Sequence, residues 1–126
     1  MIAILDTHVV IWALTDPRRL SPAARACVEA GSTGVSAATV WEMAIKRGLG
    51  KLPLPVPAAE IVALVERDLR ARLLPVEAAH AVRVESLPLH HADPFDRLLI
   101  AQAQVEGLAV CTADDAFRRY DVRVIW

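Results

Sequence analysis

Acidic side chains stand at three places in the sequence where they could act together. Asp6 follows an apolar segment, 2–5, that is typical of a short buried strand. Asp114 comes two residues after a second apolar segment, 108–112, and Asp96 lies in the first turn of a helix predicted to begin at Pro94. In a parallel sheet, the carboxyl ends of the strands and the start of a helix that leads into a strand share one edge. We therefore predict that these three carboxylates are neighbours.

Glu42 is a fourth candidate, because it is a charged residue among apolar neighbours in a predicted helix. Four carboxylates at one edge repel one another strongly unless a cation lies among them. Oxygen ligands without a nearby cysteine favour Mg²⁺ or Mn²⁺ over Zn²⁺. Such ions assist phosphoryl transfer by neutralising the charge that develops and by activating a water. The set predicts a metal centre formed by Asp6, Glu42, Asp96 and Asp114.

Each acid also has an ordinary structural interpretation. Asp6 and Asp114 could cap the helices that follow them, and Asp93 and Asp96 could be a cap and a first-turn acid of one helix. Glu42 could form an ion pair with the lysine one turn further on, at position 46. These roles account for each residue alone, but not for the convergence of all of them at one edge.

Other residues with reactive or aromatic side chains are given simpler roles. The histidines could be ligands or bases, and the pair just before the acidic helix start, His90 and His91, are held as candidate substrate contacts. For His8 we expect a structural role or a place at the rim of the site. Five residues are expected to be buried, three as core rings and two as free thiols: Trp12, Trp41, Phe95, Cys27 and Cys111.

The elements that must position these residues alternate between strands and helices. This alternation predicts an α/β fold, a three-layer sandwich with a short central parallel sheet flanked by helices. Residues 49–57 contain glycine and proline breakers and are expected to form a loop. The expected strands are 2–5, 33–36, 74–76, 108–112 and 122–125. The expected helices are 7–14, 22–30, a third that begins at Ser36 or Thr39 and ends at Arg47, 57–73, 77–86, 94–106 and 114–119.

Length and composition indicate one globular domain, 1–126, with one real core. The net charge of −1 does not indicate a broad nucleic-acid-binding surface, so positive charge is local. The longest unbroken apolar run, Val9–Leu14, is too short to cross a membrane. Because no basic segment precedes the first apolar residues, we expect no signal peptide and a cytoplasmic location. The local basic patches are Lys46, Arg47 and Lys51, and Arg118 with Arg119.

Four segments have an order and spacing that match a known family and together cover nearly the whole chain. They are Leu5-Asp6-Thr7-His8, Trp41 to Lys46 with Gly50 to Leu54, His91 to Ala103, and Thr112-Ala113-Asp114. An Asp-Thr pair alone is weakly specific, whereas the Trp-Glu run and the Asp-Pro-Phe-Asp-Arg helix start are highly specific. With these segments the sequence resembles the PIN-domain ribonucleases, and among them the VapC-type toxins of bacterial toxin–antitoxin pairs.

The resemblance implies a PIN-like fold and a metal-dependent endoribonuclease that hydrolyses RNA with an activated water and Mg²⁺ or Mn²⁺. It places Asp6, Glu42, Asp96 and Asp114 at the metal-site positions of the family. It also implies a homodimer that is held inactive by a cognate VapB-type antitoxin. The sequence departs from many relatives at His8, where they have asparagine. Supporting positions are Thr7, Asp93, Thr112 and Lys46, and candidate RNA contacts are Arg97, Arg118 and Arg119.

Two other functions fit parts of the sequence. A phosphate switch would need adjacent acids after the first strand, or a second aspartate two residues after Asp6, where the chain has His8. A binding protein without catalysis would use apolar surface for an antitoxin or a second copy. The helix expected over 57–73 and the segment around Trp12 are the expected interface. The presence of all four acids favours catalysis.

Overall fold

A single parallel sheet runs through the centre of the molecule. The computed structural model describes residues 1–52, 54 and 56–126, so Pro53 and Pro55 of the expected loop 49–57 lie outside the described residues. Within the described residues, the sheet has five strands in the order β3-β2-β1-β4-β5, and every neighbouring pair is parallel. This confirms the predicted parallel pairing. The strands are β1 (Ala3–Leu5), β2 (Thr33–Ser36), β3 (Arg72–Leu74), β4 (Ala109–Cys111) and β5 (Val124–Ile125).

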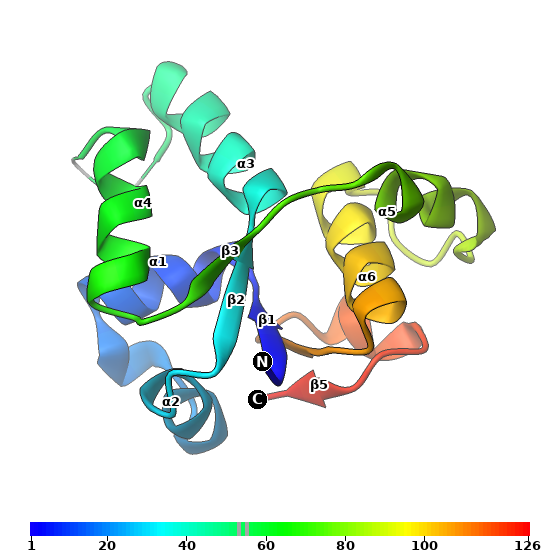
Figure 1. Cartoon of the computed structure of the whole chain (residues 1–126), viewed down its shortest axis with the longest axis horizontal. Coiled ribbons are helices and arrows are strands. Elements are labelled where there is room, and N and C mark those ends of the chain that lie inside the picture. The colour runs from blue at the N-terminus through cyan, green and yellow to red at the C-terminus, as the bar shows by residue number, and fades with distance from the viewer. Residues whose placement is uncertain (53, 55) are drawn as a thin grey trace.

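Helices cover both faces of the sheet and give the predicted three-layer sandwich (Figure 1). Leu5 and Val35 pack with the helices on one face, whereas Ile4 and Val110 pack with the helix on the other. Because strands covered on both faces have no polar side, their short apolar sequences follow from this arrangement. The face that includes Leu5 and Val35 carries α1 (Thr7–Thr15), α2 (Pro22–Glu29) and α4 (Ala58–Arg67). The helix α3 (Ala37–Gly48) follows β2. The helices α5 (Ala78–Arg83) and α6 (Pro94–Glu106) lie on the other side.

Helix ends follow the capping signals of the sequence. The Ser36 side chain accepts the N–H of Ala38, at 3.1 Å, so that α3 begins directly after β2. The Asp93 carboxylate accepts the N–H groups of Phe95 and Asp96, at 2.8 and 3.0 Å, and Pro94 occupies the first helical position. At the other end, α6 stops at Gly107, whose φ of +68° is the left-handed conformation that favours glycine. These caps fix the backbone positions from which the side chains of the candidate site project.

The helix predicted over 57–73 is wrong at its end. The helix α4 stops at Arg67, and the strand predicted at 74–76 is instead β3, two residues earlier. Arg70 has a φ of +52°, a left-handed conformation that no α-helix continues through. Leu69 and Ala71 nevertheless remain buried. The apolar spacing therefore continues beyond the end of α4, which is why the sequence pattern predicted a longer helix.

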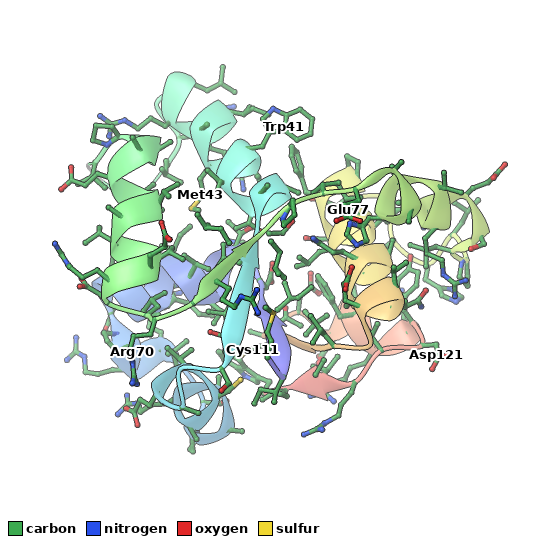
Figure 2. The ribbon with its side chains drawn as sticks, viewed as in Figure 1. Trp41, Met43, Arg70, Glu77, Cys111 and Asp121 are labelled. Carbon is green, nitrogen blue, oxygen red and sulfur yellow. The ribbon has the colours of Figure 1, made fainter. Side chains whose placement is uncertain are left out.

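The prediction that Trp41 lies in the core is also wrong. Its side chain is 60% exposed on α3 and meets the Phe95 ring edge-on, with ring centroids 5.2 Å apart. Met43, two residues further along, is fully buried, and Figure 2 shows the two side chains on different sides of the helix. Side chains two residues apart in the sequence of a helix point about 200° away from each other, so only one of these two side chains can face the core. Trp12 and Phe95 are half-buried rather than central.

The two cysteines behave as predicted. Cys27 and Cys111 are both buried and both free. Among the described residues, no helix combines the length and the apolar character needed to cross a membrane.

Candidate active site

Asp6 occupies the junction between β1 and α1, and its carboxylate is held from two sides. One oxygen accepts the backbone N–H of Thr7 at 2.7 Å, and the other accepts the hydroxyl of Thr112, also at 2.7 Å. Thr112 follows β4, which pairs with β1, so the hydrogen bond joins two neighbouring strand ends. Burial raises the pKa of Asp6, although both hydrogen bonds lower it. The side chain is therefore fixed in place while its negative charge is poorly compensated.

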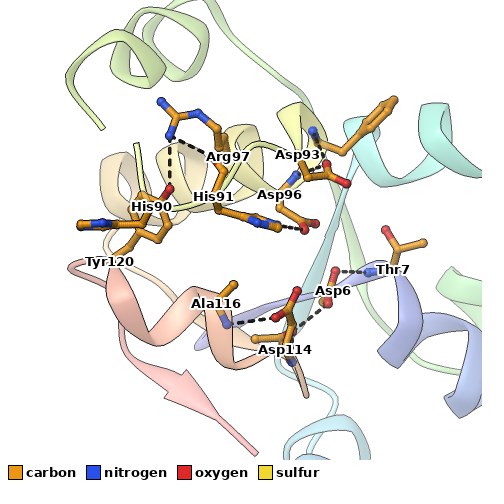
Figure 3. A network of polar contacts seen from close by, with 12 residues as sticks. Asp6, Thr7, His90, His91, Asp93, Asp96, Arg97, Asp114, Ala116 and Tyr120 are labelled. Carbon is orange, nitrogen blue, oxygen red and sulfur yellow. Dashed lines mark hydrogen bonds and ion pairs between the residues drawn. The ribbon is translucent and has the colours of Figure 1, made fainter. Parts of the chain in front are cut away.

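Asp114 is exposed and sits beside Asp6 at the same edge of the sheet. Its backbone N–H donates to the Thr112 hydroxyl oxygen at 3.0 Å, and one carboxylate oxygen accepts the N–H of Ala116 at 2.9 Å. One threonine side chain thus connects the backbone of one acid to the carboxylate of the other. The predicted proximity of Asp6 and Asp114 is confirmed, and Figure 3 shows both side chains at the mouth of the site.

Asp96 reaches the same mouth from the first turn of α6 (Figure 3). Its Oδ2 lies 2.8 Å from Nε2 of His91. Burial raises the pKa of Asp96 to about 6, against the lowering effect of the hydrogen bond with His91, and the charges of Asp6 and Asp93 raise it further. His91, Asp96 and Asp114 each offer a ligand atom within 4.8 Å of the others.

Glu42 lies on α3 and is 8% exposed, with both carboxylate oxygens occupied. One oxygen accepts the hydroxyl of Thr7 at 2.7 Å, and the other pairs with the Lys46 ammonium at 2.7 Å. The predicted ion pair with Lys46 is therefore present. Thr7 donates its backbone N–H to Asp6 and its hydroxyl to Glu42. Since the negative charge of Glu42 also raises the pKa of Asp6, Glu42 belongs to the electrostatic environment of the mouth.

The donor chemistry of the mouth fits a divalent cation. Asp6, Asp96 and Asp114 provide carboxylate oxygens, which hard cations such as Mg²⁺ and Mn²⁺ prefer. Burial raises the pKa of Asp6 and that of Asp96, and a cation among these carboxylates would lower both by stabilising the ionised forms. The imidazole of His91 is itself hydrogen-bonded to one of these carboxylates.

The comparison with known protein families decides the identity of this fold. A family model described as PIN domain matches residues 3–123. The chain belongs to the PIN domain family. A similar protein is Ribonuclease VapC22 from Mycobacterium tuberculosis (strain ATCC 25618 / H37Rv), which is 32% identical over 120 residues, covering 93% of this chain and 90% of the relative.

Solved structures agree with this PIN domain assignment at the level of the fold. One is VapBC2 from Rickettsia felis bound to a DNA fragment from its promoter, with a TM-score of 0.73, 15% identity, and coverage of 98% of this chain and 97% of that chain. Another is FitAcB from Neisseria gonorrhoeae, with a TM-score of 0.62, 24% identity, and coverage of 98% and 96%. At these identities the likeness establishes the architecture alone.

In this PIN domain, Arg97 is not available to RNA, and we correct its predicted role. The residue is 9% exposed and points from α6 away from the acids, toward the segment that leads to His91 (Figure 3). Because a buried guanidinium needs acceptors for its five N–H donors, the chain surrounds it with oxygens. These are the carbonyls of Val84, Leu87, Pro88 and His91 and the hydroxyl of Tyr120, at 2.8–3.5 Å.

His91 is the residue whose place the sequence reasoning missed. The sequence offered it as a possible ligand, base or substrate contact without placing it, and in the structure it lies against Asp96. His90 instead packs edge-on against Tyr120, with ring centroids 5.3 Å apart. Its position five residues before Asp96, across a proline-led helix start, is the signal that could have located it. Asp93 serves as the cap of α6. Arg118 and Arg119 are exposed on η3 (Asp115–Arg119), and their contact with RNA stays a prediction.

Proposed function

We propose that this chain is a metal-dependent endoribonuclease that acts as the toxin of a toxin–antitoxin pair. The observation that carries the proposal is the convergence of Asp6, Asp96 and Asp114 on one mouth of a PIN domain (Figure 3). The name of the relative Ribonuclease VapC22 supports RNA as the substrate. The reaction is the hydrolysis of phosphodiester bonds by a water molecule.

The contacts of each residue at the mouth of the site indicate its role in the proposed reaction. Asp6, Asp96 and Asp114 would hold Mg²⁺ or Mn²⁺, and such an ion neutralises charge on a reacting phosphate and makes water a better nucleophile. Thr112 and Thr7 orient the Asp6 carboxylate by hydrogen bonds. Glu42, fixed by Thr7 and Lys46, completes the site or orients the attacking water.

A cognate VapB-type antitoxin is the proposed partner. The structures that resemble this chain include VapBC and FitAB complexes and a toxin–antitoxin complex from Klebsiella pneumoniae, and these complexes support an antitoxin as the partner. The homodimer and the cytoplasmic location stay predictions.

Exposed apolar side chains on α3 and α5, such as those of Trp41, Ile45 and Val82, offer contact area for a partner that the expected interface on 57–73 did not include.

Cleavage of total RNA by the purified chain tests the proposed function. We expect discrete fragments in the presence of Mg²⁺ or Mn²⁺, none in the presence of chelator, and none from the Asp96→Asn variant, because each condition removes part of the metal centre. The rival interpretation is a PIN domain that binds without turnover. It would be favoured if folded, antitoxin-free protein cut no RNA with either ion.

The raised pKa of Asp96 makes metal binding depend on pH. At about 6, this pKa means that the carboxyl group is mostly protonated at pH 5 and mostly ionised at pH 7. Because a metal ion must displace that proton, we expect the affinity for Mn²⁺ to fall about tenfold between pH 7 and pH 5. Titration calorimetry at both pH values measures the change. Equal affinity at pH 5 and 7 would contradict the assignment of Asp96 as a ligand.

A further inference from the structure

A cavity of about 260 Å³ opens beside the acids on the side of α1. One wall is formed by Asp6, Asp114 and Ala113, and the other by the rings of His8 and Trp12. The two rings come from positions one helical turn apart on α1, so they lie on the same face of the helix, and their centroids are 5.7 Å apart. An aromatic wall and an acidic wall thus share one space.

Two further groups lie against the Trp12 ring. The ring of Trp126, which follows β5, lies with its centroid 5.9 Å from that of Trp12. The Arg19 guanidinium carbon lies 4.6 Å from the centroid of the Trp12 ring. Trp12 therefore borders the acidic cavity and also contacts a second ring and a cation.

Core packing explains only part of this arrangement. Trp12 is half-buried and contacts the core cluster, but His8 and Arg19 are exposed and have no place in the core. The rings of His8 and Trp12 are tilted by 44° to one another, and the Arg19 guanidinium lies over the Trp12 ring. Aromatic rings at the edge of a cavity, with a guanidinium nearby, are the combination with which proteins bind single-stranded nucleic acid, because each base has a face that can stack on a ring and each phosphate carries a charge.

We propose that the cavity that Asp6 and Asp114 share with His8 and Trp12 is a stacking site for an unpaired nucleobase of the RNA substrate. The proposal rests on the proposed function, since it assumes that a phosphate of the same strand lies at Asp6 and Asp114. The base of an adjacent nucleotide enters the cavity and stacks on the aromatic wall, and Arg19 meets a phosphate further along the strand. A base within a duplex has both faces covered by its neighbours, so the site selects single-stranded RNA.

The test compares strands with and without bases. Fluorescence anisotropy would measure binding of a labelled oligo(A) 8-mer and of an abasic ribose-phosphate 8-mer, with Mg²⁺ present, to the cleavage-deficient Asp96→Asn protein. Adding Trp12→Leu is expected to weaken oligo(A) binding about tenfold. Binding of the abasic strand is expected to change less than twofold, because that strand has nothing to stack. Equal weakening of both strands, or of neither, would overturn the proposal.

Two further variants separate stacking from folding. Trp12→Phe keeps an aromatic ring and is expected to retain oligo(A) affinity within about threefold. Val105→Ala removes an exposed apolar side chain near the C-terminal end of α6, away from the acids, and is expected to leave the affinity for both strands unchanged. If Trp12→Leu does not fold, Trp12→Phe and His8→Ala still decide the question. A loss of oligo(A) binding in Trp12→Phe as large as in His8→Ala would contradict ring stacking.

Failure of this proposal can be told from failure of the proposed function. If the wild-type chain cleaves RNA and Trp12→Leu weakens both strands equally, the nuclease stands and the stacking site does not. If the wild-type chain cleaves no RNA but Trp12→Leu selectively weakens oligo(A), the stacking site stands and the nuclease assignment does not.

Discussion

Replacing Asp6 by asparagine is expected to reduce RNA cleavage at least about 1,000-fold, because a carboxylate that holds the metal contributes several kcal/mol of transition-state stabilisation. The same variant is expected to be at least as stable as the wild type when no metal is present. Burial raises the pKa of Asp6 in the folded chain, so its contribution to stability is present at low pH and is lost as pH rises through the folded pKa. At pH 7 the ionised carboxylate therefore opposes folding, and the neutral amide does not.

Urea denaturation at pH 7 with chelator, together with the RNA cleavage rate, measures both effects. Asp115→Asn is the matched control, since it removes the same charge from a side chain that is 97% exposed beside the site. It should change neither the cleavage rate nor the unfolding free energy by much. If the Asp6→Asn protein unfolds more easily than the wild type when chelator is present, the ionised Asp6 carboxylate stabilises the fold as a helix cap and does not oppose folding.

The sequence contained most of the fold because its signals are local. Ser36, Asp93 and Gly107 mark helix ends through their own backbone geometry, and short apolar runs between helices indicate parallel strands. The placement of Asp6 and Asp114 followed from the topology of such sheets, and the pairing of β1 with β4 confirms it. Hydrogen bonding through Thr112 was not predictable in detail, but its position was.

The sequence did not predict side-chain orientations that depend on how the helices and strands pack. Trp41 and Met43 have similar hydrophobicity, so which of them faces the core depends on the angle at which α3 packs. Arg97 adjoins a proposed metal ligand in the sequence, yet it points away from that site and becomes buried. A helix places adjacent residues about 100° apart, and sequence proximity therefore misled the assignment of Arg97 to RNA.

Replacing Arg97 by alanine is expected to destabilise the fold by about 3 kcal/mol. The guanidinium donates to the carbonyls of Pro88 and Leu87 and to the hydroxyl of Tyr120, so its loss leaves buried acceptors without donors and opens a cavity. This loss is large against a total stability of about 5–15 kcal/mol for a typical domain. Urea denaturation measures it. Arg119→Ala is the matched control, because that exposed side chain only approaches the His90 carbonyl, at 3.5 Å, and should cost less than about 0.5 kcal/mol.

Arg97→Lys separates a structural guanidinium from an RNA contact. A lysine keeps the charge but cannot donate in the five directions that the surrounding oxygens require, so the segment that carries His91 loosens while the net charge is unchanged. A residue that neutralises a phosphate lowers the salt dependence of RNA binding by about one unit of slope when its charge is removed. We therefore expect Arg97→Lys, which keeps the charge, to lose stability, and Arg97→Ala, which removes the charge, to keep the salt slope of RNA binding. Full stability of Arg97→Lys together with a slope smaller by about one unit in Arg97→Ala would return Arg97 to the RNA surface.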